Sequence, residues 1–304
     1  MAFSIIREMA KAATEKKELN EGQLSSDNFI FFGNNGKSTI AASLSELTTE
    51  PVLMLSPAGA SAHLSEQFPN AIFYTVNGLA ELKSIILDLE KNMEIIKKIK
   101  NNLAYEARLK IIKEEFAKEY GKADLDKASS DWTECYNLAK NGRFPISAIV
   151  LEEIDIISSW IQDVVEAKMN LSVIGSDKKN MSADWAELKT ELMNFYSKIL
   201  KLPVRTIFCT SDKIPKEQQN LDKIIPNIAL GQTNRLLLNL VGNVFYTNAE
   251  KNKYTIRLVG NSTIFIKSKF VPIKYGKPII EELDVTGDPS KFWTYIDEVK
   301  NSCK

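Results

Sequence analysis

The chain has 304 residues, of which 44% are hydrophobic and 26% charged, and its 39 Lys and Arg balance 39 Asp and Glu. These values are typical of a globular protein with a sizeable core, and they exclude a disordered chain and a uniformly basic nucleic-acid coat. A single His and three scattered Cys exclude the usual Cys/His zinc sites and disulfide frameworks. No stretch approaches the ~18 uncharged apolar residues of a membrane helix, and the N-terminus lacks the apolar region of a signal peptide. We therefore expect a soluble cytoplasmic protein with reduced cysteines and no membrane partner.

The first part of the chain predicts a helical arm followed by an α/β sheet. Apolar residues recur at helical spacing through about Lys17, and the polar stretch NEGQLSSDN then breaks the pattern, which predicts an N-terminal helical arm over 1–26. From residue 27, helical stretches separate short apolar segments that read FIFF, PVLML, AIFYTV, SAIVLEEI and VRTIFCTS. Strands that are apolar on both faces are typical of a parallel sheet covered by helices on both sides. We expect a doubly wound, mainly parallel α/β domain over 27–278.

A charge-rich helical segment at about 79–143 exceeds what a minimal α/β domain needs, so we interpret it as an insertion. Its apolar residues follow alternating four- and three-residue steps, at Leu82, Ile86, Leu89, Met93, Ile96 and Leu103. This pattern fits a helix pair packed on its own domain, or a short coiled coil with another protein. The insertion is therefore a candidate surface for a protein partner.

The last third of the chain changes from helical to alternating patterns. A helix over SADWAELKTELMNFYSKILK precedes the VRTIFCTS strand. After Gly231, the segments NVFYTN, YTIRLV and STIFIKSKF have a period of two, which predicts antiparallel strands that close the sheet as a meander. Residues 279–304 predict a C-terminal helix and tail, with Asp288 or Ser290 as its cap.

The most informative segment reads FIFFGNNGKSTIAASL, from Phe29 to Leu44. It is an apolar strand, a Gly/Asn-rich turn and a helix, the order of a phosphate-binding loop. In such loops backbone N–H groups cradle phosphate oxygens, the Lys neutralises charge, and the next hydroxyl binds Mg²⁺. The sequence therefore predicts an ATP and Mg²⁺ site formed by Gly33, Asn34, Asn35, Gly36, Lys37, Ser38 and Thr39.

The loop departs from the full G-x-x-x-x-G-K-[ST] spacing, because the first glycine position falls on Phe31. Two alignments remain open. Either Gly33 is the first loop glycine and the loop is two residues short, or Gly33 and Asn34 lie inside a full-length loop. A third interpretation is an ordinary turn followed by a helix start, although the flanking strand and helix favour nucleotide binding.

The order of the parts resembles that of phage RecA-like ATPases. The chain contains, in order, the phosphate loop, the PVLMLSPAG, IVLEEID and VRTIFCTSD strands, the PNIALGQTNRLLLNLVGNVFY segment and IFIKSKF. More narrowly, it resembles the phage nucleotide-binding proteins that assist single-strand annealing and recombination. The resemblance covers 27–278 apart from the insertion. It implies a RecA-like P-loop fold, a homo-oligomer with a site shared between subunits, and the host cytoplasm as the location.

The resemblance also assigns roles to two acids. Lys37 and Ser38 would bind phosphate and Mg²⁺, while Glu152 occupies the place of the Asp that organises Mg²⁺ and would act through a water. Glu153 would polarise the attacking water. The alternative is that both acids only start the following helix, whose N-terminal dipole favours negative charge.

Other catalytic positions of the family are altered here. RecA-like enzymes place a glutamate after the second strand, where this chain reads LSPAGAS without an acid. Thr210 or Ser211 would sense the γ-phosphate. Lys267 and Lys269 would share one face of a late strand and reach the neighbouring subunit's nucleotide. Nucleotide binding without fast hydrolysis is therefore an open alternative.

A basic stretch at 251–277 contains no Asp or Glu. Its bases are Lys251, Lys253, Arg257, Lys267, Lys269, Lys274 and Lys277, and its interleaved aromatics are Tyr254, Phe265, Phe270 and Tyr275. Phosphate neutralisation and base stacking are how proteins bind single-stranded DNA. The alternative is an ordinary solvated hairpin whose aromatic residues face the core.

Three functions follow from these patterns. The first is a Mg²⁺-dependent ATPase that acts on single-stranded DNA in phage recombination or replication. The second is a structural or assembly protein of a phage particle or complex that keeps the P-loop fold and hydrolyses ATP slowly or not at all. The third, a ParA-like partition ATPase, fits the NNGKST turn but fits the downstream strand order less well. His63 carries no functional hypothesis, and Cys209 is expected to be an inert thiol in a buried strand.

Overall fold

A computed structural model describes residues 28–57, 59, 61–101, 144–175, 181–213, 223–228, 231–250, 253–274 and 277–302. Its centre is an eight-stranded sheet with the order β12-β9-β8-β1-β5-β4-β2-β3. The strands are β1 (Asn28–Gly33), β2 (Val52–Pro57), β3 (Ala71–Val76), β4 (Ala148–Leu151), β5 (Arg205–Thr210), β8 (Asn243–Glu250), β9 (Lys253–Arg257) and β12 (Glu282–Asp284). Two short pairs join β6 (Asp212–Lys213) to β7 (Ile225–Pro226) and β10 (Ile273–Lys274) to β11 (Lys277–Pro278).

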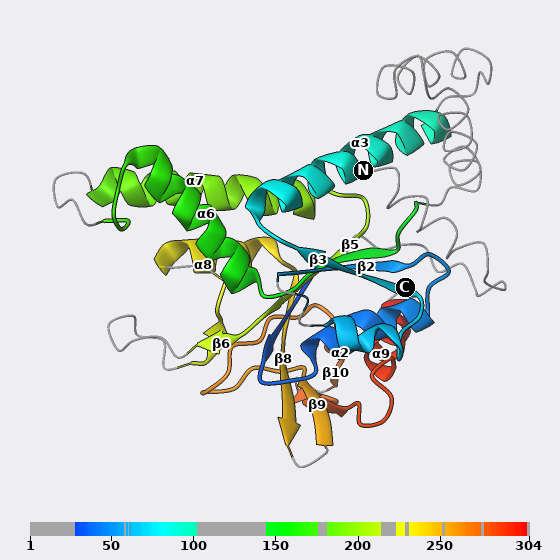
Figure 1. Cartoon of the computed structure of the whole chain (residues 1–304). Coiled ribbons are helices and arrows are strands. Elements are labelled where there is room, and N and C mark those ends of the chain that lie inside the picture. The colour runs from blue at the N-terminus through cyan, green and yellow to red at the C-terminus, as the bar shows by residue number, and fades with distance from the viewer. Residues whose placement is uncertain are drawn as a thin grey trace.

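Helices cover both faces of this sheet (Figure 1). One face carries α3 (Leu79–Asn101), α6 (Ile154–Met169), α7 (Met181–Leu200) and α8 (Gly231–Leu240). The other carries α2 (Lys37–Ser43) and α9 (Lys291–Ser302), together with the short 3₁₀ helices η1 (Leu44–Glu46) and η2 (Ala62–Ser65). The prediction of a doubly wound, mainly parallel α/β fold with antiparallel strands at its C-terminal side is confirmed.

Both faces of β1 are buried, as its sequence requires. Ile30 and Phe32 belong to the hydrophobic core under α3, α6, α7 and α8, whereas Phe29 and Phe31 belong to the core under α2 and α9. The neighbouring strands β5 and β8 run parallel to β1. A strand that alternates between two cores cannot slip by one residue without exchanging every side chain, so the end of β1 is firmly placed.

The predicted C-terminal meander is confirmed for the antiparallel pair of β8 and β9 and is corrected in two respects. First, β8 runs parallel to β1 on its other side, so that the antiparallel part of the eight-stranded sheet consists of the β8–β9 and β9–β12 pairs. Second, the segment 263–270 forms no strand but only isolated bridges, between Ile224 and Ile264 and between Val244 and Lys267. The physical reason is that β9 occupies the edge of β8 from Tyr246 to Glu250, which leaves only the base of β8 for this segment.

The first part of the segment predicted as an insertion lies on the sheet. Leu82, Ile86, Leu89 and Met93 of α3 are buried in the core that α3 shares with α6. These positions therefore pack within the chain, while Ile96 and Leu103 lie outside the side chains that the structure describes. The helical arm at 1–26 also lies outside the described residues, so the domain boundaries stay predictions.

Among the helices that the structure describes, none combines the length and apolar character needed to cross a membrane.

Candidate nucleotide site

The phosphate loop is shorter than the full motif. Strand β1 continues through Gly33, with Phe31 fully buried and paired with Cys209, and α2 begins at Lys37. Only Asn34, Asn35 and Gly36 connect the strand to the helix, and both asparagines are exposed. The alignment that makes Gly33 the first loop glycine is therefore the one that the structure adopts, with two residues between the glycines instead of four.

Both loop glycines have backbones that other residues rarely adopt. Gly33 has a φ of 119°, and a Cβ there would lie 2.2 Å from the carbonyl oxygen of Thr247. Gly36 has a φ of 87° as the residue that starts α2, and a Cβ there would lie 3.3 Å from the Tyr254 ring. The turn thus depends on glycine at each end, for the close approach of β8 in one case and for the entry into the helix in the other.

The first turn of α2 presents main-chain donors to this loop. The first helical hydrogen bond runs from the N–H of Ile40 to the carbonyl oxygen of Gly36, at 2.9 Å. The N–H groups of Lys37, Ser38 and Thr39 precede it and have no partner within the helix. Such N–H groups and the positive end of the helix dipole favour an anion. The indole N–H of buried Trp293 in α9 donates to the Ile40 carbonyl oxygen at 2.7 Å, which fixes α2 on the core.

The ammonium group of Lys37 folds back across the loop. Its Nζ donates to the carbonyl oxygens of Gly33 at 2.7 Å and Asn34 at 3.2 Å. A lysine ammonium has three donors, so one remains for a phosphate oxygen. The hydrogen bonds hold the charge next to the N–H groups of α2, which is the arrangement needed to neutralise a polyphosphate.

Two adjacent acids follow β4 at the same edge of the sheet. Glu152 is 1% exposed, and its Oε2 accepts a hydrogen bond from the Ser61 hydroxyl, while its Oε1 has no partner among the described residues. Glu153 has a left-handed backbone with a φ of 48°, and its buried Oε2 likewise has no partner there. Burial, together with the negative charges of Glu152 and Asp155, raises the pKa of Glu153, and the positive charge of Lys37 partly offsets this.

These oxygens suit a cation that arrives with a nucleotide. No group of three or more His, Cys, Asp or Glu among the described residues could hold a metal ion by itself. Mg²⁺ at phosphate sites needs only one or two protein oxygens, because phosphate and water supply the others. A buried carboxylate oxygen without a hydrogen bond is costly, and Glu152 Oε1 is such an atom among the described residues.

The two candidate γ-phosphate sensors both have partners within the chain. The Thr210 hydroxyl is buried and donates to the carbonyl oxygen of Asn227 at 2.5 Å, and the Ser211 hydroxyl donates to Oδ2 of Asp155 at 2.9 Å. The side-chain amide of Asn227 contacts Oγ of Ser211 at 3.2 Å. This network joins the end of β5 to the start of α6. In this structure the Thr210 and Ser211 hydroxyl groups therefore bind other parts of the chain and hold these two elements together.

The structure separates Lys267 from Lys269. The Lys267 ammonium donates to the carbonyl oxygens at the end of α8, those of Leu238, Asn239 and Val241, at 2.9–3.1 Å. Lys269 is exposed, with its ammonium 5.2 Å from the centre of the Phe270 ring. The prediction that both lysines share one face of a strand is wrong, because no strand forms there. Their reach to a neighbouring subunit stays a prediction, and for Lys267 it requires release of the α8 carbonyls.

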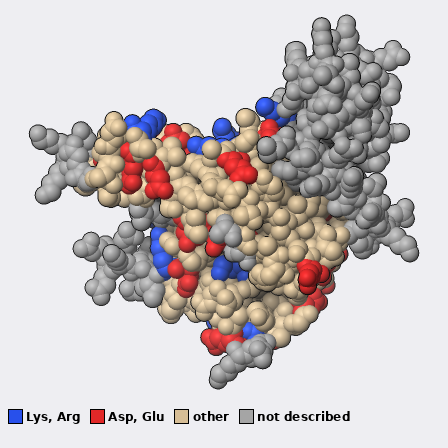
Figure 2. Space-filling view, viewed as in Figure 1, with Lys and Arg blue, Asp and Glu red and all other residues tan. Residues whose placement is uncertain are grey.

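The two bases of the basic stretch that lie on β9 face acids of β12, while the side chains of Lys274 and Lys277 are not among those described. Lys253 lies 4.0 Å from Asp284, and Arg257 lies 3.4 Å from Glu282, each across the β9–β12 pair. Phe270 is buried in the core, whereas Tyr254 is 43% exposed. Figure 2 shows Lys and Arg interspersed with Asp and Glu on the visible face of the described residues, without an extended basic area. Lys251 and Tyr275 lie outside the described residues.

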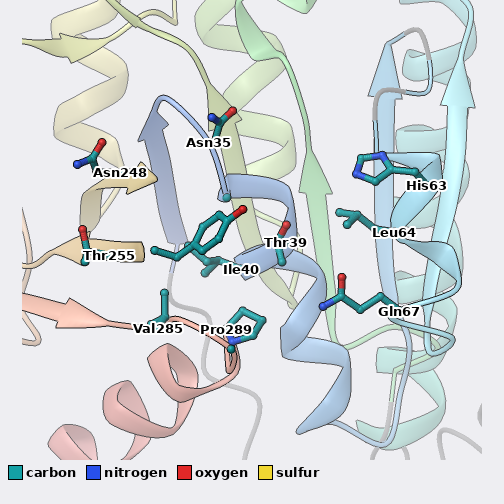
Figure 3. A pocket seen from close by; sticks show the side chains of 13 residues that line it. Asn35, Thr39, Ile40, His63, Leu64, Gln67, Asn248, Thr255, Val285 and Pro289 are labelled. Carbon is teal, nitrogen blue, oxygen red and sulfur yellow. The ribbon is translucent and has the colours of Figure 1, made fainter. Parts of the chain in front are cut away.

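A pocket of about 430 Å³ opens beside the phosphate loop. Asn35, Gly36, Thr39 and Ile40 form one side of it. In Figure 3, η2 supplies His63 and Leu64 together with nearby Gln67, while Asn248 and Thr255 come from β8 and β9. The remaining lining residues are Tyr254, Val285, Gly287 and Pro289. The pocket combines an apolar floor with amide, imidazole and hydroxyl groups, which is typical of small-molecule sites.

Sequence reasoning missed this pocket, because its residues come from four separate parts of the chain and carry no common motif. His63, which has no expected role in the sequence, lies on its wall. Buried Cys209 agrees with the expectation of an inert thiol, since burial raises its pKa well above the usual range.

No family model matches the sequence, and no curated protein matches it either. Among solved structures, a KaiC-like protein from the hyperthermophilic archaeon Pyrococcus horikoshii OT3 is similar, with 11% identity and a TM-score of 0.31. The match covers 85% of this chain and 83% of that chain. At this level the likeness carries no argument, so the fold is described by its own strand order and by the strand, loop and helix around Lys37. On those grounds the chain has a doubly wound, mainly parallel α/β fold.

Proposed function

We propose that this protein binds ATP together with Mg²⁺. The observation that carries the proposal is the Lys37 ammonium, which two carbonyl oxygens of the loop hold beside the N–H groups of α2. A glycine at each end of the turn allows that approach. The triphosphate lies on residues 33–39, and the nucleoside lies in the neighbouring pocket, which shares Asn35, Gly36 and Thr39 with the loop.

Mg²⁺, when bound with the nucleotide, supplies charge neutralisation at the phosphates. Ser38 and Glu152 are the residues that would hold it, Ser38 through its hydroxyl and Glu152 through its unpartnered Oε1. Because Glu152 is buried, we expect removal of its charge to weaken cation binding and to leave the charge of the protein surface unchanged.

Hydrolysis, in this proposal, is slow. Glu153 is the acid that polarises the attacking water, and its raised pKa suits a group that accepts a proton. The position after β2, where a second acid is expected, instead brings Ser61 onto Glu152. That contact favours the second candidate, a P-loop protein with impaired hydrolysis that acts in assembly. Phosphate release in the presence of Mg²⁺ that is lost in Glu153→Gln supports the first candidate, whereas ATP binding without release, or with a slow release that Glu153→Gln leaves unchanged, supports the second.

Single-stranded DNA in phage recombination is the partner that the resemblance implies, with a homo-oligomer as the working form. At that surface Asp284 and Glu282 lie near Lys253 and Arg257 and partly balance their positive charge. Phosphate release measured with and without single-stranded DNA decides the question. Stimulation supports the DNA role, whereas an unchanged rate removes DNA from the proposal.

The test of nucleotide binding is a titration with a fluorescent ATP analogue and Mg²⁺. Lys37→Ala removes a charged hydrogen-bond donor, so we expect the Kd to rise roughly 10- to 100-fold. Lys83→Ala, at an exposed position on α3, is the matched control and leaves the Kd unchanged. Equal affinities of the wild type and Lys37→Ala would contradict the proposal.

A further inference from the structure

Ser61 makes a contact that its own helix does not explain. It is the residue that starts η2, and its carbonyl oxygen accepts the N–H of Leu64 at 2.9 Å. A serine at such a position normally uses its hydroxyl to cap the helix. Here the side chain makes no capping bond and donates instead to Oε2 of Glu152, which is 91 residues away in the chain.

The turn before Ser61 fixes the direction of this contact. Gly59 has a φ of 66°, and its carbonyl oxygen accepts the N–H of Ala62 at 3.1 Å. On the other side, the N–H of Glu152 donates to the carbonyl oxygen of Leu55 at 3.0 Å, which joins the end of β4 to β2. Ser61 is 2% exposed and Glu152 is 1% exposed. Both partners are thus buried, and main-chain hydrogen bonds hold the segments that carry them.

The hydrogen bond distinguishes the two oxygens of the carboxylate. With Oε2 engaged by Ser61, Oε1 is the oxygen without a partner among the described residues. A carboxylate that is hydrogen-bonded at one oxygen loses the rotation that would exchange the two. Residues that orient a metal-binding side chain in this way commonly change metal affinity when they are removed.

We propose that Ser61 is a positioning residue that orients Glu152 for the cation accompanying the nucleotide. The inference rests on the proposed function, because it concerns the same site. It assigns a role to the loop after β2, which lacks an acid and has no other assigned part in that site. Ser61 acts through Glu152 and needs no contact with the nucleotide.

The experiment measures the Kd of the fluorescent ATP analogue in Mg²⁺ and in EDTA, and takes the ratio of the two affinities as the Mg²⁺ enhancement. The variants are Ser61→Ala, Glu152→Gln and the double substitution. Ser65→Ala, at an exposed serine in the same 3₁₀ helix, is the matched control. Thermal unfolding of every variant reports whether the fold is intact.

We expect Ser61→Ala to lower the Mg²⁺ enhancement roughly tenfold. Glu152→Gln lowers the enhancement as well, and the double substitution adds no further loss, because Ser61 acts only through Glu152. Ser65→Ala matches the wild type. If Ser61→Ala does not fold, Ser61→Cys retains the volume and weakens the donor, and the same loss of enhancement is expected.

Several results would overturn the inference. One is an unchanged Mg²⁺ enhancement in Ser61→Ala; if the affinity then falls equally in Mg²⁺ and in EDTA, the role of Ser61 is purely structural. Another is an additive loss of enhancement in the double substitution. A wild type that binds the analogue without any Mg²⁺ enhancement would overturn the inference while the nucleotide proposal stands. A wild type that does not bind the analogue at all would overturn both.

Discussion

Gly33 determines where the strand ends and the phosphate loop begins. Its backbone lies against the Thr247 carbonyl oxygen of β8, at a distance that leaves no room for a Cβ. Strand β1 continues through Gly33 and α2 begins at Lys37, so that only three residues connect them. The turn therefore depends on Gly33 for the approach to β8 and on Gly36 for its left-handed backbone.

Gly33→Ala is expected to destabilise the protein by at least about 3 kcal/mol, because it adds a main-chain clash to an unfavourable φ. Gly287→Ala is the control: its φ of 75° is also left-handed, but nothing lies within 4 Å of the added Cβ. That change should cost about 1–2 kcal/mol. Denaturant unfolding measures both, and equal losses would show that the approach to Thr247 is unimportant.

Glu153→Gln tests whether this acid is held at the expense of stability. The pKa of Glu153 is raised from its ordinary value of 4.5, so the ionised form is disfavoured in the folded state. The resulting loss of stability is absent below the unfolded-state pKa and complete above the folded-state pKa. We expect Glu153→Gln to raise the Tm at pH 8, to leave it unchanged near pH 4, and to lower phosphate release. A Tm gain that is equal at both pH values would contradict this explanation.

At the scale of elements, the central strands and the β8–β9 pair were predictable, whereas the fate of the segment 263–270 was not. The segments that form β1, β2, β4 and β5 are apolar on both faces and are buried between two helical layers, as that pattern requires. The β3 segment was expected to be buried as well, but it forms the edge of the sheet and only its two end residues are buried. The segment 263–270 alternates like a strand, but pairing partners decide whether a strand forms. Its partner edge is taken by β9, a fact that no local pattern contains.

The position of Lys267, a candidate site residue, could not be predicted from the local sequence pattern either. Its spacing from Lys269 suggested one strand face, whereas its ammonium stabilises the C-terminal end of α8, where a positive charge is favourable. The contact joins α8 to a segment 26–29 residues later, so only the tertiary structure reveals it.

Lys267→Met is therefore expected to destabilise the protein by about 1.5–3 kcal/mol, because carbonyl oxygens at the helix end lose a charged donor. Lys269→Met, which removes a cation–ring contact at an exposed site, should cost less than about 1 kcal/mol. Denaturant unfolding compares the two variants. If Lys269→Met is as destabilising as Lys267→Met, the hydrogen bonds of Lys267 to the α8 carbonyl oxygens do not contribute the expected stability.

At the scale of the whole molecule, the site forms where the phosphate loop meets the C-terminal strands. Trp293 ties α9 to α2 through the Ile40 carbonyl oxygen, and its ring packs against Phe29 and Phe31. The pocket beside the loop therefore depends on residues from both ends of the described chain. The loop itself could be predicted from contiguous residues, whereas the pocket could not, since it exists only after residues 35–40 and 248–289 come together.

The most direct test of the central claim is a crystal structure of the protein with Mg²⁺ and a non-hydrolysable ATP analogue. We expect the triphosphate on the N–H groups of Lys37, Ser38 and Thr39, with the Lys37 ammonium on a phosphate oxygen and the nucleoside in the pocket between Thr39, His63 and Asn248. An analogue bound elsewhere, or a loop that keeps its ligand-free contacts at saturating analogue, would contradict it.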